Sequence, residues 1–95
     1  MAAYLIFIKD REHDAAAMAD YSAKAGGSIA GHAAKPLAYY GAIETLEGAE
    51  AQGAVVIEFP TMDEARAWYR SDAYQAARAR RFAGADYRVI LTQGL

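Results

Sequence analysis

The chain has 95 residues and a net charge of −2, so it is long enough for one domain, which we place over residues 1–95. An acidic balance argues against a dedicated nucleic-acid binder, whose surface would be basic, and the absence of cysteine excludes disulfide and thiol chemistry. The first residues, MAAYLIFIKDREH, have no basic stretch ahead of their apolar run and reach a charge at Lys9. They predict neither a signal peptide nor a membrane span, and we expect a cytoplasmic protein.

Two segments have the pattern of central β-strands. Residues 54–59 (AVVIEF) lie between Gly53 and Pro60 and alternate between a fully apolar face and a face whose one polar side chain is Glu58. Residues 3–9 (AYLIFIK) are apolar on both faces over most of their length, as expected of a strand that is covered on both sides. The polar residues 10–13 are predicted to be a connection.

Two further strands are predicted over residues 37–43 (LAYYGAI) and 86–92 (DYRVILT). The first could continue as far as Leu46, and Gly41 inside it indicates a bulge or a bend. A polar loop then leads to residues 54–59, so these two strands are expected to form a hairpin with a long loop.

The helices are predicted from their caps. Asp14 is a suitable N-cap for a helix over about residues 15–29, which Pro36 closes off. Thr61 and Glu64 fit the S/T-x-x-E capping box at the start of a second helix. Ser71 is a further candidate N-cap, which predicts a kink followed by another helical segment over residues 73–82.

The element order is therefore β-α-β-β-α-β. Right-handed crossovers then give an antiparallel sheet with its helices on one face, the ferredoxin-like α+β arrangement. The opposite face would carry Val56, Ile90 and one side of the first strand, which is too apolar to leave in water. We therefore predict a homodimer in which two copies pack sheet to sheet.

Several motifs along the chain form a recognisable set. They are ETLEG at 44–48, VIEFP at 56–60, AWYRS at 67–71 with Tyr74-Gln75, Arg81, and RVIL at 88–91 with Gly94. With these motifs the chain resembles the domain of unknown function 1330 family over nearly its whole length. The resemblance implies the dimeric α+β barrel superfamily, whose relatives include small cofactor-independent monooxygenases, proteins similar to muconolactone isomerase or chlorite dismutase, and many members without an assigned activity. The sequence departs from the family at Tyr40-Gly41-Ala42, where many members have a basic residue followed by paired glycines.

Glu58 is the first candidate for chemistry. A carboxylate in the middle of a sheet is costly to bury unless it is paired, and Arg88, on the same type of face, could pair with it. The functional interpretation is a general base or a ligand anchor inside the barrel. The structural interpretation is an ion pair or a dimer contact.

Aromatic side chains supply a candidate ligand wall. Trp68, Tyr69 and Tyr74 have helical spacing, which is more often typical of a core than of a pocket, but at least one is expected between helix and sheet edge. Tyr39 and Tyr40 are adjacent in a predicted strand, so one is expected on each side of the sheet. The one on the cavity side could hydrogen-bond a ligand.

The histidines and the other basic residues give weaker signals. His32, near the end of the first helix, could act as a base, although a lone histidine is more often structural. It is too far from His13 for an H-x-x-x-H motif, so we predict no metal and no cofactor.

No G-x-G-x-x-G motif follows a strand, which argues against a nucleotide site. The remaining basic side chains are expected to form mostly a solvated face: Lys35, Arg78, Arg80 and Arg81.

The sequence leaves open whether the protein is an enzyme. The favoured function is binding of a small apolar or aromatic molecule in a cavity between the sheet faces of a homodimer, through Tyr39, Tyr40, Glu58, Trp68 and Arg88. The first alternative is a cofactor-independent oxygenase or isomerase, with Glu58 or His32 as the base and Arg88 stabilising charge. The second alternative is a structural or regulatory dimer without a cavity.

Overall fold

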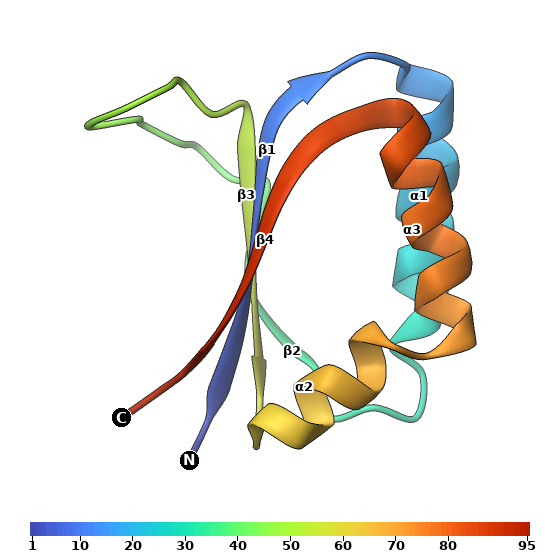
Figure 1. The fold of residues 1–95 in the computed structure, drawn as a ribbon, viewed down its shortest axis with the longest axis vertical. Helices are drawn as coiled ribbons and strands as arrows, with labels where there is room; N and C mark the ends of the chain where they lie inside the picture. Colours follow the sequence, from blue (N-terminus) through green and yellow to red (C-terminus); the bar gives the residue numbers. More distant parts are fainter.

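In the computed structural model, which describes residues 1–95, three helices cover one face of a four-stranded antiparallel sheet (Figure 1). The strand order is β2-β3-β1-β4, so β1 and β3 are central, and the predicted ferredoxin-like arrangement is confirmed. None of the helices is both long enough and apolar enough to cross a membrane. The elements in chain order are β1 (Ala3–Glu12), α1 (Ala15–Ser28), β2 (Lys35–Tyr39), β3 (Gly53–Phe59), α2 (Met62–Tyr69), α3 (Asp72–Gly84) and β4 (Ala85–Gln93).

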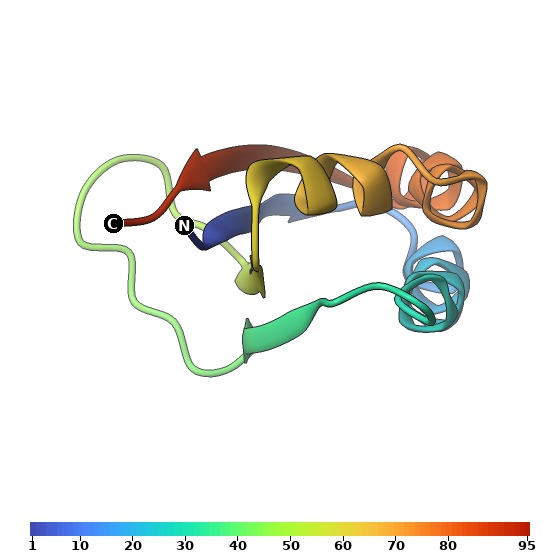
Figure 2. The same ribbon diagram turned by 90° about the horizontal axis from the view of Figure 1, so that it is seen from below.

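The three predicted helix caps are present. The Asp14 carboxylate accepts the backbone N–H groups of residues 16 and 17, at 3.0 and 3.2 Å. The Thr61 hydroxyl accepts from the N–H of Glu64 at 3.1 Å, and the Ser71 hydroxyl accepts from the N–H of Tyr74 at 3.2 Å. Because each cap satisfies a backbone donor that has no partner within its helix, α1, α2 and α3 begin where the sequence predicts. Helices α1 and α3 then pack side by side (Figure 2).

Strand β1 is longer than predicted. Residues 10–12 are not a connection, because Arg11 and Glu12 pair with the beginning of β4 after a shift in register between Lys9 and Arg11. The polar composition of this segment reflects its position at the end of the sheet, where the strand extends past the core and its residues are largely exposed.

Strand β2 is shorter than predicted and lies nearer the N-terminus. It begins at Lys35 and ends at Tyr39, and it contains Pro36, which an edge strand can accommodate. The irregularity in its pairing falls between Pro36 and Ala38 and not at Gly41. The segment after Tyr39 is not paired as a strand, and it leads into the loop that extends away from the helices (Figure 1).

Tyr40 turns the chain out of β2 and ends the alternation of side chains. Its φ of 49° lies in the left-handed region, which large residues seldom adopt. Its backbone N–H donates to the carbonyl of Ala54 at 2.9 Å. The rings of Tyr39 and Tyr40 consequently lie together, with centroids 4.8 Å apart, and the prediction that they face opposite sides of the sheet is wrong.

The two faces of the sheet differ in their surroundings. Alternate residues of β3 are buried beneath the helices, among them Val55, Ile57 and Phe59. On the other face Ile6 pairs in register with Val56 on one side and with Ile90 on the other, which makes an apolar row across the sheet. In the single chain Ile90 is 50% exposed, so this row is not covered by the chain itself.

Gly53 is the position where the packing of Tyr40 can be tested. A Cβ at residue 53 would lie 2.8 Å from Cδ1 of Tyr40, so Gly53→Ala forces the ring to move. We expect this variant to lose about 1–3 kcal/mol of unfolding free energy, measured by urea denaturation. Gly41→Ala is the matched control, because nothing lies within 4 Å of its Cβ. In a Tyr40→Ala background the loss from Gly53→Ala should nearly vanish, and an equal loss in both backgrounds would contradict this account.

Candidate functional site

An apolar cavity of about 150 Å³ lies between α1 and the helix-covered face of the sheet, beside the edge strand β2. Its largest lining side chains are Phe7, Tyr21, Tyr39, Tyr40, Ile57 and Trp68, which come from β1, α1, α2, β3 and the end of β2. Tyr39 is 63% exposed, so the cavity reaches the surface near this residue. An engineered apolar cavity of about this volume in another protein binds benzene, so the space suits a single aromatic ring.

The aromatic wall is fixed by a tightly packed cluster. Trp68 is 2% exposed and lies between Phe59 and Tyr74, with ring centroids 5.7 and 4.2 Å away. Its indole N–H donates to the hydroxyl of Ser28 at 3.1 Å, and that hydroxyl donates to the carbonyl of Ala25 at 2.6 Å. The polar atom of Trp68 is therefore satisfied within the protein, and its ring presents an apolar surface to the cavity.

Two tyrosine pairs place hydroxyl groups beside the cavity. Tyr21 and Tyr40 line the cavity, and each hydroxyl is bonded to that of a second tyrosine behind it, Tyr74 at 3.0 Å and Tyr87 at 2.5 Å respectively. Burial raises the pKa of all four phenols above the ordinary value. All four therefore remain protonated at neutral pH and act as hydrogen-bond donors as well as acceptors.

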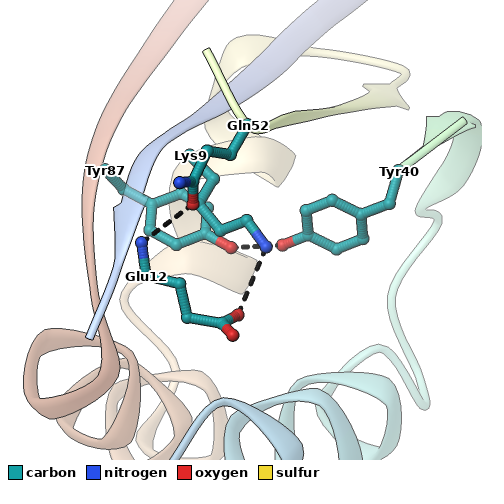
Figure 3. Close-up of polar contacts among 5 residues, drawn as sticks. All are labelled: Lys9, Glu12, Tyr40, Gln52 and Tyr87. Atoms are coloured by element: carbon teal, nitrogen blue, oxygen red, sulfur yellow. Dashed lines mark hydrogen bonds and ion pairs between the residues drawn. The ribbon is translucent and has the colours of Figure 1, made fainter. Parts of the chain in front are cut away.

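Tyr40 is held in place by charged residues from the end of β1 (Figure 3). The ammonium group of Lys9 lies 5.4 Å from the centre of the Tyr40 ring and pairs with Glu12 at 3.3 Å. The backbone N–H of Glu12 donates to the side-chain carbonyl of Gln52 at 2.9 Å, which ties this group to the residue that precedes β3. The extension of β1 beyond the core therefore provides the support for one wall of the site.

Arg81 is buried and lies behind this wall. It is 2% exposed, Nε has no hydrogen-bond partner, and no carboxylate pairs with its guanidinium. The guanidinium carbon lies 5.8 Å from the ring centre of Phe7, 6.0 Å from that of Tyr21 and 5.1 Å from that of Tyr87. Aromatic ring faces thus surround a cation that has no counter-ion.

The expectation that Arg81 belongs to a solvated face is wrong. The signal that could have located it is helical spacing: Tyr74, Ala77 and Arg81 are at intervals of three and four, and all three are buried on α3. Arg80, its neighbour, does point to the surface, where it pairs with Asp20 at 3.0 Å.

Of the five residues predicted to bind a ligand, Tyr39, Tyr40 and Trp68 line the cavity. Glu58 and Arg88 lie on the opposite, open face, and they do not meet. Glu58 stands opposite Tyr4 and Arg88 opposite Ile8, so their partners on β1 are four positions apart. The predicted ion pair between them is therefore wrong.

Arg88 has a different partner. Its guanidinium binds the Asp10 carboxylate through two hydrogen bonds of 2.9 Å at the surface. These bonds lower the pKa of Asp10 and raise that of Arg88. His32 lies in the turn after α1, where its backbone N–H donates to the carbonyl of Ile29 at 3.0 Å. None of the three predicted catalytic residues, Glu58, His32 and Arg88, lines the cavity.

The raised pKa values predict that the fold weakens in alkali. In the unfolded chain the four phenols ionise near pH 10, whereas burial keeps them protonated in the fold. Their contribution to stability is therefore present below about pH 10 and is lost as the pH rises further. The urea concentration at the unfolding midpoint should decrease as the pH is raised from about 8 to about 11. The substitution Tyr21→Phe should make this decrease smaller. A midpoint that stays constant over this range would disprove the prediction.

Solved structures with the same fold include proteins of both unknown and known activity. A protein of unknown function from Rhodopseudomonas palustris has a TM-score of 0.73 at 18% identity, with 99% of this chain and 82% of that chain covered. A dimeric, ferredoxin-like protein of unknown function from Bacteroides fragilis has a TM-score of 0.69 at 12% identity, with coverage of 98% and 96%. SnoaB, a cofactor-independent oxygenase from Streptomyces nogalater, has a TM-score of 0.63 at 9% identity, with coverage of 99% and 92%. At these identities the likeness concerns the fold alone.

The sequence itself identifies the family. No curated protein matches the chain. The model of the family described as Domain of unknown function (DUF1330) matches residues 2–95, which is nearly the whole chain. The motifs in the sequence predicted this family, and the chain belongs to it.

Proposed function

We propose that the protein is a homodimer in which each subunit binds a small apolar or aromatic molecule, and that the ligand lies in the cavity between α1 and the sheet. The observation that carries the proposal is the cavity itself. It has room for about one ring, its walls are aromatic and aliphatic, and three of its lining residues are tyrosines, Tyr21, Tyr39 and Tyr40. A wall of this kind provides dispersion contacts with a ring and a small number of groups to orient it.

This position differs from the one that the sequence suggested. A space between two sheet faces needs a second copy of the chain, and Glu58 and Arg88 would border it. The cavity beneath α1 is complete within one chain and includes Tyr39, Tyr40 and Trp68. We therefore assign the ligand to the helix side of the sheet, and an inter-sheet ligand stays a prediction.

The oxygenase or isomerase alternative has less support. The likeness to SnoaB concerns the fold, and the three residues to which the sequence assigned catalysis do not line the cavity. The non-catalytic dimer without a cavity is also less favoured, because the space beneath α1 is open to a ring-sized molecule.

The dimer is proposed from the open face of the sheet. The row formed by Ile6, Val56 and Ile90 is apolar and only partly covered in one chain. Sheets that pack face to face lie about 10 Å apart and interdigitate such side chains. The protein from Bacteroides fragilis that shares this fold is described as dimeric, which supports a dimer here.

Filling the cavity tests the binding proposal. Ala25 lines the cavity from α1, and Ala25→Phe would occupy the space of one ring. We expect indole and toluene to bind the native protein saturably in ligand-observed NMR, and Ala25→Phe to abolish the signal. Ala23→Phe, on the exposed side of the same helix, should leave binding unchanged. Thermal melts check that both variants fold. Failure of every small aromatic probe to bind saturably, or binding that survives Ala25→Phe, would refute the proposal.

A charge on the open face tests the dimer. Val56→Asp places two carboxylates in the proposed interface, where neither has a partner. Sedimentation should show a dimer for the native chain and a monomer for the variant at the same concentration. Ala79→Asp, on the exposed side of α3, should remain dimeric. A native chain that is monomeric over the whole concentration range would rule out the assembly.

A further inference from the structure

Two tyrosine pairs beside the cavity each hold an O–H that has no acceptor in the protein. A phenol carries one O–H. In each tyrosine pair one hydroxyl donates and the other accepts, and none of the four hydroxyls makes a further hydrogen bond within the protein. One O–H in each pair therefore has no protein acceptor. Tyr21 and Tyr40, one member of each pair, line the cavity.

Arg81 adds a positive charge and a further donor without a partner, Nε. A guanidinium has five N–H donors, no acceptor, and a charge that persists at every physiological pH. Ring faces stabilise the cation of Arg81, but they are not hydrogen-bond acceptors of ordinary strength. Phe7 and Tyr21, whose rings lie within 6.0 Å of the guanidinium, also line the cavity, so the positive charge is separated from the cavity by a single layer of side chains.

The acidic residues of the surrounding elements have other partners. Glu12 at the end of β1 pairs with Lys9. Asp20 on α1 pairs with Lys24 and Arg80 at 3.4 and 3.0 Å. Asp86 at the beginning of β4 lies 2.9 Å from Nε2 of His13. None of them pairs with Arg81, so the protein does not itself neutralise the charge behind the cavity.

We propose that the ligand of this cavity is an aromatic acid, with its ring against Trp68 and Ile57 and its anionic oxygen, from a carboxylate or an enolate, directed at the hydroxyls of Tyr21 and Tyr40. This inference rests on the proposed function and names the class of its ligand. With Tyr74 and Tyr87 as the donors within the two pairs, the O–H groups of Tyr21 and Tyr40 are free to donate to the anion. The charge of Arg81 favours the anion across a region of low dielectric constant. Arg81 acts through the tyrosine wall and is therefore a positioning residue.

The test compares benzoate with benzamide, which has nearly the same shape and no charge. Isothermal titration calorimetry at neutral pH should give the native protein a preference for benzoate of about ten- to a hundredfold, as expected of hydrogen bonds to a charged group. Arg81→Met should bring the ratio close to one while benzamide binding is retained. Arg80→Met is the matched control, because Arg80 is the next residue and makes a surface ion pair.

Two further variants keep the test independent of the folding of Arg81→Met. Arg81→Lys retains the charge and should retain part of the preference for benzoate. The double variant Tyr21→Phe/Tyr40→Phe keeps both rings and removes both hydroxyls, and it should lower the preference several-fold. Retention of the full preference in the double phenylalanine variant would overturn the role of the hydroxyls.

The outcomes separate this inference from the binding proposal. If benzoate and benzamide bind equally well to the native protein, or if the preference survives in Arg81→Met, the aromatic-acid inference is overturned and the binding proposal stands. If neither compound binds but indole and toluene do, the inference is again overturned and the cavity takes neutral ligands. If none of the four compounds binds, both proposals fail.

Discussion

The structure depends on one constraint: the sheet is apolar on both faces, but helices cover only one of these faces. Residues such as Val55, Ile57 and Phe59 are buried beneath the helices, and no element of the chain covers the alternate row that contains Ile6 and Val56. The helix side must therefore form the whole core of a 95-residue chain. It does so with large aromatic rings, because a few such rings bury more area than many small side chains.

A core made of rings explains both the cavity and its polar boundary. Rings pack at fixed geometries, and the cluster around Trp68 and Tyr74 leaves a space beneath the small residues Ala25 and Gly26 of α1. Tyrosine brings a hydroxyl into the core with every ring, and each buried hydroxyl needs a partner. A single hydrogen bond between two tyrosines uses the O–H of one and the oxygen of the other, so one O–H in each pair is left without an acceptor in the protein. The unbonded O–H groups beside the cavity are thus a consequence of how the core is built.

The sequence predicted the elements well because their signals are local. Thr61 and Ser71 begin helices through contacts within one turn, and residues 54–59 alternate clearly. The site was predicted in part, since Trp68, Tyr39 and Tyr40 are at the cavity. The failures involve long-range geometry. Whether Glu58 meets Arg88 is decided by the register of two strands on either side of β1. The ring of Tyr40 packs where Gly53, thirteen residues away, has no Cβ. The basic residues around Arg81 suggested that its side chain is exposed to solvent. Its helical spacing from Tyr74, however, places it on the buried face of α3.

Arg81 is difficult to explain by stability alone. Moving a guanidinium out of water costs several kcal/mol, and cation–π contacts return about 0.5 to 2 kcal/mol each. An apolar side chain of similar size at such a position is often as stable or more so. An arginine is usually paired with a carboxylate, as Arg88 is, which binds Asp10 through two hydrogen bonds at the surface. An anion that enters from the cavity would supply to Arg81 the charge that Asp10 supplies to Arg88. Binding an acid would then relieve a cost that the empty fold already carries, and part of that relief would appear as affinity.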